Sequence, residues 1–109
     1  MAYEVLLTAD AEKDLEELYS YLSEHDSPEK ANHVLEEIES AFSRLSNLPD
    51  RGAYPKELSA LGIREYREVF FKPYRIVYRV VGERVYVLVI VDGRRDMQTL
   101  LQRRLFSAT

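Results

Sequence analysis

Cysteine and tryptophan are absent from this sequence of 109 residues, and histidine occurs only twice. The lack of cysteine excludes a disulfide framework and a thiolate metal site, so we expect a protein of the reducing cytoplasm. His25 and His33 stand in an acidic segment and lack the i, i+4 spacing of a paired metal site on a helix. We therefore expect neither a metal ion nor another cofactor.

Long hydrophobic runs are also lacking. The longest, Val85 to Val91, has seven residues, whereas a membrane-spanning helix needs about 20. Residues Met1 to Glu4 show neither a basic nor an apolar segment, so we expect no signal peptide and no membrane partner. No Gly-x-Ser-x-Gly, phosphate-binding glycine loop or dinucleotide fingerprint occurs, which leaves acyl transfer, nucleotide hydrolysis and hydride transfer without support.

The charges that are present divide the chain into two unlike halves. The length predicts a single domain over residues 1–109, with a net charge of -4. Residues 1–50 hold three cations against thirteen acids, a net charge of -10, whereas residues 51–109 hold twelve cations against six acids, a net charge of +6. Ten of those twelve cations are arginine, which pairs bidentately with carboxylate and phosphate. We expect an anionic partner to bind the C-terminal half.

Hydrophobic spacing in the acidic half predicts one strand followed by two helices. Tyr3 to Thr8 is rich in strand-forming residues, and apolar residues then recur every three or four positions from Ala9 to His25. Ser27 and Pro28 suit the start of a second helix, which Asn47-Leu48-Pro49 ends. The short connection predicts that the two helices pack antiparallel.

The basic half predicts three strands and a last helix. Residues 49–62 form a loop with room for one helical turn, and strands follow at about 64–71, 74–81 and 84–91. Gly82-Glu83 fits a two-residue hairpin turn with positive φ at the glycine, and Asp96 can cap a helix from Met97 to Leu105. The predicted order is β-α-α-β-β-β-α, an α+β fold with an antiparallel sheet of about four strands and a helical hairpin on one face.

The hairpin turn also predicts which side chains share a sheet face. If Val81 pairs with Arg84, the face under the helices carries Tyr74, Ile76, Tyr78 and Val80 beside Val85, Val87, Val89 and Val91. The opposite face, which we expect to be uncovered, carries Arg75, Val77, Arg79 and Val81 beside Arg84, Tyr86, Leu88 and Ile90. The segment from Asp92 to Leu105 has the alternative of folding back over part of that face.

Arginines are interleaved with tyrosines in this half, a pattern that favours anionic ligands. The set comprises Arg64, Arg67, Arg75, Arg79, Arg94 and Arg95 with Tyr66, Tyr74 and Tyr86. Such a surface suits a phosphodiester backbone with bases stacked on tyrosine, or the acidic and partly apolar tail of a protein. The competing interpretation is that Arg75 and Arg79 are ordinary cross-strand or edge residues that protect the sheet from aggregation. It applies more to Arg79 and Arg84 than to Arg75 and Arg95.

The run Arg64-Glu-Tyr-Arg-Glu-Val-Phe-Phe-Lys-Pro-Tyr-Arg-Ile-Val-Tyr-Arg-Val, followed by Asp92-Gly-Arg-Arg-Asp-Met and Leu-Leu-Gln-Arg-Arg-Leu, resembles toxins of the RelE/ParE superfamily of bacterial toxin–antitoxin modules. The resemblance covers nearly the whole chain. It implies a cytoplasmic toxin, found in plasmid stabilisation modules, that a cognate antitoxin neutralises. ParE-like members inhibit DNA gyrase by binding it, and RelE-like members cleave mRNA on the ribosome.

The branches differ in the residues they require. Arg75 and Arg95 match the two arginines of the RelE-like nucleases, but Leu101 stands where those enzymes have a late tyrosine and Asp92 where they often have histidine. A nuclease also needs an acid and a base, for which Glu68 and Tyr86 are candidates, with Glu57 and Asp92 as further bases. The isoelectric point of about 5.2 disfavours binding to ribosomal RNA.

We therefore predict a ParE-like toxin of a type II module that acts by binding rather than catalysis. The antitoxin is expected to carry an acidic, amphipathic segment that folds as it binds the arginine face. The alternatives are a ribosome-dependent mRNA endonuclease and a non-toxic relative that only binds antitoxin. The predicted partner-binding residues are Arg64, Arg67, Arg75, Val77, Arg79, Tyr86, Leu88, Arg94 and Arg95.

Overall fold

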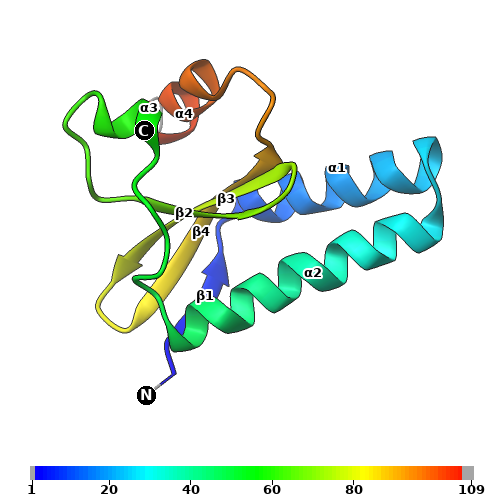
Figure 1. The fold of residues 1–109 in the computed structure, drawn as a ribbon, viewed down its shortest axis with the longest axis horizontal. Coiled ribbons are helices and arrows are strands. Elements are labelled where there is room, and N and C mark those ends of the chain that lie inside the picture. Colours follow the sequence, from blue (N-terminus) through cyan, green and yellow to red (C-terminus); the bar gives the residue numbers. More distant parts are fainter. Residues whose placement is uncertain (1, 107–109) are drawn as a thin grey trace.

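The computed structural model describes residues 2–106 and contains four strands and four helices within them (Figure 1). The expected α+β class and the order of the predicted elements are confirmed, and the loop after the second helix contains one additional helical turn, α3. In chain order the elements are β1 (Glu4–Leu7), α1 (Ala9–His25), α2 (Pro28–Asn47), α3 (Lys56–Ser59), β2 (Arg67–Phe71), β3 (Tyr74–Val81), β4 (Arg84–Asp92) and α4 (Met97–Phe106).

The sheet has the strand order β1-β4-β3-β2. The strands β2, β3 and β4 pair antiparallel, whereas β1 runs parallel to β4, so the expectation of a wholly antiparallel sheet was wrong for this strand. No turn connects β1 to its partner, because the two strands are separated by most of the chain. Adjacent strands reveal their direction through the turn between them, and β1 offers no such signal.

The helical hairpin forms where its caps and apolar stripe predict it. The Thr8 hydroxyl accepts a hydrogen bond from the Ala11 amide at 3.2 Å, and the Ser27 hydroxyl accepts one from the Lys30 amide at 3.0 Å, which satisfies donors that a helix leaves unpaired at its start. The buried stripe of α2 then packs with α1 against one face of the sheet. That stripe consists of Ala31, Val34, Ile38, Ala41 and Leu45.

A bulge in β4 changes the predicted register. Gly82 adopts the expected positive φ, 61°, and the pairing runs as predicted from Val81–Arg84 to Tyr78–Val87. Beyond it Val77 pairs with Val89, so Leu88 is an extra residue. The expectation that Val89 and Val91 lie under the hairpin was therefore wrong: Ile90 lies there. A continuous apolar run lacks the alternation that would specify its register.

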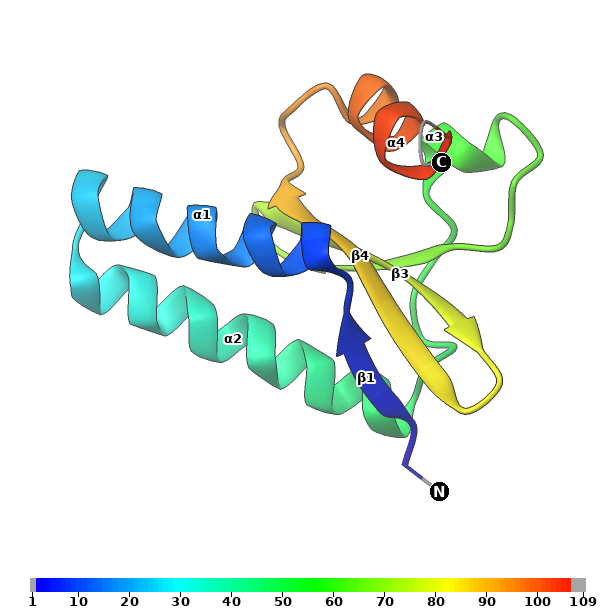
Figure 2. The ribbon, with the colours of Figure 1, turned by 180° about the vertical axis from the view of Figure 1, so that it is seen from behind.

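The other sheet face is covered where we expected it to be bare. Leu58 of α3 and both Met97 and Leu101 of α4 pack with Val77, Val89 and Val91 in a second, smaller apolar cluster. Figures 1 and 2 show α3 and α4 beside each other, on the opposite side of the sheet from α2. The alternative in which the C-terminal segment folds back is confirmed. None of the helices in residues 2–106 is long and apolar enough to span a membrane.

Candidate functional site

Arg75 lies beneath α3 rather than on an open surface. Its Nε donates to Glu68 Oε1 at 2.8 Å, and its two terminal nitrogens donate to the two oxygens of Glu57 at 2.8 and 2.9 Å. Arg75 and Glu68 are each only 6% exposed. The expectation that Arg75 protrudes towards a partner was wrong. Its position on β3 lies beneath α3, and α3 places the Glu57 carboxylate against the guanidinium.

The two carboxylates that share Arg75 have different environments. The hydrogen bond from Arg75 lowers the pKa of Glu57, whereas burial raises the pKa of Glu68 despite the same guanidinium. The pKa of Arg75 is raised, first of all by its hydrogen bond to Glu57. This guanidinium is already committed to two anions, so it is not available to a phosphate or to a partner's carboxylate.

Arg64 and Arg67 hold the loop that follows α2. The Arg67 guanidinium donates to the Gly52 carbonyl at 2.8 Å and to the Tyr54 hydroxyl at 3.2 Å. Both guanidinium groups also lie over the Tyr54 ring, at 5.6 Å for Arg64 and 4.7 Å for Arg67, within the range of cation–π attraction. These two predicted binding residues therefore have intramolecular partners that position the segment near Gly52.

The uncovered part of the second sheet face lies towards the β3–β4 turn. Arg79 is exposed there, with its guanidinium 5.8 Å from the centre of the Tyr66 ring. Val81 is also exposed, and Tyr86 and Leu88 are half-buried. Val77, by contrast, is completely buried under the second cluster. This region keeps the predicted combination of one arginine with apolar and aromatic groups.

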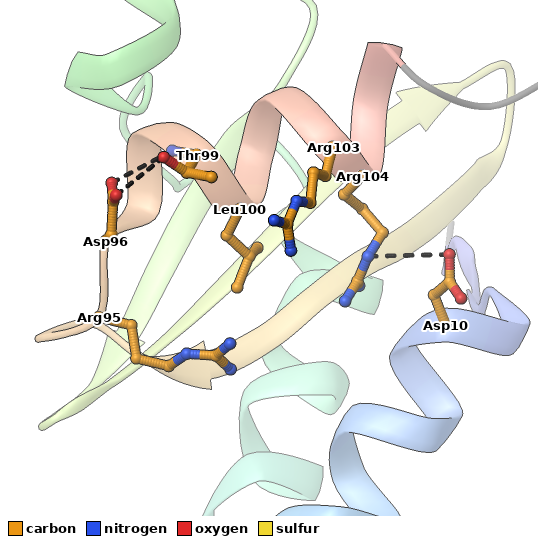
Figure 3. Close-up of a pocket in the computed structure, with 7 residues that line it drawn as sticks. All are labelled: Asp10, Arg95, Asp96, Thr99, Leu100, Arg103 and Arg104. Carbon is orange, nitrogen blue, oxygen red and sulfur yellow. Dashed lines mark hydrogen bonds and ion pairs between the residues drawn. The ribbon is translucent and has the colours of Figure 1, made fainter.

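Arg94 and Arg95, which follow the end of β4, differ in the contacts of their side chains. Arg94 forms a close ion pair with Asp92 at 2.6 Å, and this hydrogen bond lowers the pKa of Asp92. The Arg95 side chain is exposed and makes no hydrogen bond or ion pair within residues 2–106. It lines a pocket of about 430 Å³ between α4 and the start of α1 (Figure 3), which we call the α4–α1 pocket. Its other lining residues are Asp10, Asp96, Thr99, Leu100, Arg103 and Arg104.

One wall of this pocket is fixed by an ion pair between residues far apart in the chain. Arg104 donates to both oxygens of Asp14, at 2.9 and 3.1 Å, and to the Leu88 carbonyl at 2.7 Å. Asp14 also accepts the Ile90 amide at 3.0 Å. Because β1 ends opposite Val87, these side chains satisfy the backbone groups of β4 that β1 does not reach.

Sequence reasoning missed Asp14 and Arg104. Asp14 stands among several acids of an amphipathic helix and resembles an ordinary solvated residue. Arg104 belongs to the closing helix, in which no sequence motif indicates an ion pair with the first helix. Ninety positions separate them, and no local pattern connects two residues at that distance. Only the path of the chain brings them together.

The structure brings together only part of the set that a nuclease would need, since Arg75 contacts the candidate bases Glu57 and Glu68. Arg75 and Glu68 are paired in the interior, and Arg95 lines the α4–α1 pocket. Tyr86 precedes Asp92 by six positions on β4, a separation of about 20 Å at ~3.3 Å per residue. Within residues 2–106 there is also no cluster of His, Cys, Asp and Glu side chains that would hold a metal ion. Glu57 and Glu68 therefore neutralise the candidate cation that they contact, Arg75.

Comparison with known proteins identifies the family of this chain. The family described as "ParE toxin of type II toxin-antitoxin system, parDE" matches residues 5–97. Toxin ParE3 of Caulobacter vibrioides is 32% identical over 100 residues, which cover 92% of this chain and 96% of that protein.

Two solved structures have the same fold. A chain of the chromosomal ParDE system of P. aeruginosa matches with a TM-score of 0.69 and 23% identity over 84% of this chain and 96% of that one. A chain of the RelBE2 toxin–antitoxin complex of Mycobacterium tuberculosis matches with a TM-score of 0.59 and 26% identity over 84% of this chain and 99% of that one. The resemblance to the RelE/ParE superfamily is confirmed, and the chain belongs to the family of ParE toxins of type II toxin–antitoxin systems.

Proposed function

We propose that this toxin inhibits DNA gyrase by binding it in the cytoplasm, without catalysis, and that a cognate antitoxin neutralises it. The observation that carries the proposal is the state of Arg75, which is buried and bonded to Glu57 and Glu68. Cleavage of RNA needs positive charge that is free to stabilise the transition state, together with an acid and a base. The corresponding arginine here is neutralised by its own chain.

The electrostatics support the same choice of target. The chain has a net charge of -4, and the long hairpin that forms one side of the molecule contributes most of its acids. Affinity for a ribosome depends on neutralising phosphates, which this distribution disfavours. A protein target imposes no such requirement, because the charges of two proteins can complement each other patch by patch.

The antitoxin is proposed to bind the uncovered part of the second sheet face. Arg79 supplies a cation, and Val81, Tyr86 and Leu88 supply apolar and aromatic contacts. An acidic, amphipathic segment complements this combination and gains most from folding as it binds. Both solved structures named above come from toxin–antitoxin systems, which supports a partner of this kind.

Two reactions test the proposed target. The purified toxin is added to a gyrase supercoiling reaction and, separately, to a translating ribosome mixture. We expect loss of supercoiling and intact mRNA. Cleavage of mRNA on the ribosome would contradict the proposal and favour the RelE-like nuclease. Inactivity in both reactions would favour the non-toxic relative that only binds antitoxin.

A charge reversal tests the antitoxin surface. The partner to be used is the antitoxin, identified as a product of a neighbouring reading frame with a DNA-binding N-terminus and an acidic tail, if one is found. Arg79→Glu should weaken its affinity about tenfold or more, the expected cost of one charge-assisted contact. Lys72→Glu, an equal change of charge at another exposed residue, is the matched control. Equal losses in the two variants, measured by calorimetry, would contradict this location.

A further inference from the structure

We propose that the α4–α1 pocket is a second docking surface, which binds a protein segment that presents a carboxylate to the arginines and a lysine or arginine to α1. It is separate from the sheet face assigned to the antitoxin, since its lining residues come from α1, α4 and the segment before α4. The partner is defined by its charge pattern. Three features of the pocket support this docking surface: its fixed walls, the disposition of its cations and the sign of the charge beside them.

The walls of the pocket are held in place before any ligand arrives. Arg104 links α4 to Asp14 of α1 and to the Leu88 carbonyl of β4. At the other end of the pocket, Asp96 accepts hydrogen bonds from the Thr99 amide at 3.2 Å and the Thr99 hydroxyl at 2.8 Å, which caps α4. A docking site made of fixed elements loses less conformational entropy when it binds.

Two arginine side chains of the pocket extend towards the apolar side chain of Leu100. Figure 3 shows Arg95 from the segment before α4 and Arg103 from α4 both extending towards Leu100. The side chain of Arg95 makes no hydrogen bond or ion pair in the part of the chain that the structure describes, so its guanidinium donors are open to a ligand. A glutamate or aspartate suits this place, because its carboxylate can pair with the planar guanidinium while its methylene groups contact Leu100.

The charge next to these arginines has the opposite sign. Asp10, Asp14 and Glu17 are spaced by four and three positions along α1 and therefore share one side of that helix. Asp14 is hydrogen-bonded to Arg104, and Asp10 forms a longer ion pair with it at 3.7 Å, whereas Glu17 is exposed on the same side of the helix. Both Asp10 and Glu17 contribute to the raised pKa of Arg104. The pocket thus lies on a boundary between arginines of α4 and carboxylates of α1.

The presence of both arginines and carboxylates at the pocket favours binding of a peptide over a nucleic acid. A phosphodiester strand carries negative charge at every unit, so the part that extends past the arginines would be repelled by Asp10 and Glu17. A peptide can place a carboxylate beside Arg95 and a lysine beside Glu17, so both sides of the boundary are complemented. The occupant is therefore a protein segment of mixed charge with an apolar residue over Leu100.

The test uses three probes and nuclear magnetic resonance of the full chain. The first is a short peptide with a central glutamate, neighbouring leucines and terminal lysines. The second replaces that glutamate with glutamine, and the third is a single-stranded DNA oligonucleotide of equal length. We expect only the glutamate peptide to bind clearly and to shift the side-chain Nε–Hε signal of Arg95.

Two substitutions, with one control variant, test the cationic and the acidic side of the pocket separately. Arg95→Glu should weaken the glutamate peptide about tenfold, whereas Arg51→Glu, an equal change of charge at an exposed residue outside the pocket, should not. Glu17→Lys should weaken the peptide and strengthen the oligonucleotide. The amide spectrum of each variant checks that it is folded. Unchanged peptide affinity in Arg95→Glu, no peptide binding to the wild type, or tighter binding of the oligonucleotide would each overturn the proposal.

Discussion

The two faces of the sheet are covered by different means. On the hairpin side, two long helices bury a continuous apolar stripe that includes Ile38 and Leu45. On the other side, α3 has four residues and α4 has ten, lengths at which a helix is marginal by itself. Ion pairs of Arg75 and Arg104 hold these short helices on a smaller apolar cluster. Hydrophobic area is enough for the first face, whereas the second depends on specific charge pairs.

This difference determines which arginines remain for partners. Two of the residues predicted to bind a partner are hydrogen-bonded within the chain instead. Arg75 pairs with Glu57 of α3, and Arg67 donates to the Gly52 carbonyl. Arg79 and Arg95 keep exposed guanidinium groups. The same residue type thus has two tasks in one half of the chain, and the partners that the fold supplies to each arginine distinguish them.

The largest effect is expected from breaking the pair that holds α3. Arg75→Ala leaves Glu57 and Glu68 without their common cation, which should lower the free energy of unfolding by about 3–5 kcal/mol. Urea denaturation measures the loss. Lys72→Ala, which changes the same charge at an exposed position, should alter stability by less than about 0.5 kcal/mol. Similar values for the two variants would show that the second face does not depend on Arg75.

The next prediction concerns the loss of stability when a buried residue is removed from the apolar cluster on either face. Ile38 and Leu101 are both completely buried, so each substitution by alanine should lower the free energy of unfolding by about 2–5 kcal/mol. The two variants should differ in which segment of the chain unfolds locally first. Leu101→Ala should accelerate hydrogen exchange first in α4, and Ile38→Ala should accelerate it across both hairpin helices. Identical exchange patterns would contradict the division into two clusters.

The smallest effect concerns the dependence of stability on pH. The lowered pKa of Glu57 gives a stabilisation that is present above its unfolded pKa and is lost as pH falls through the folded value. The raised pKa of Glu68 acts in the opposite sense, because its contribution is present at low pH and is lost as pH rises through the folded value. Between about pH 6 and pH 3 the two partly cancel.

Single substitutions should expose each contribution. Glu68→Gln should make the loss of stability on acidification steeper than in the wild type, and Glu57→Gln should make it shallower. Denaturation midpoints measured across this range report both slopes. A change of the same sign in the two variants would show that Arg75 does not divide its carboxylates as the structure indicates.

Much of the fold could be predicted from the sequence because the signals involved are local. Thr8, Ser27 and Pro28 define helix starts that the structure reproduces, and Gly82 takes the positive φ that its turn requires. The candidate site could be predicted only in part. Arg79 and Arg95 lie on the surface as expected, but the burial of Arg75 depends on α3, whose position has no signal in the sequence around Arg75.

The order of the elements, the hairpin over the sheet and the division of charge between the two halves all follow from local sequence signals, because caps, turns and periodicity act within a few residues. The direction of β1, the bulge at Leu88 and the pairs Arg75–Glu57 and Arg104–Asp14 arise only when the chain is folded. The pairing of β1 and the two ion pairs join segments that are distant in the chain, and the bulge lies in an apolar run without the alternation that would specify its register. Their partners are selected by packing and by the need to satisfy buried polar groups, conditions that exist only once the chain has folded.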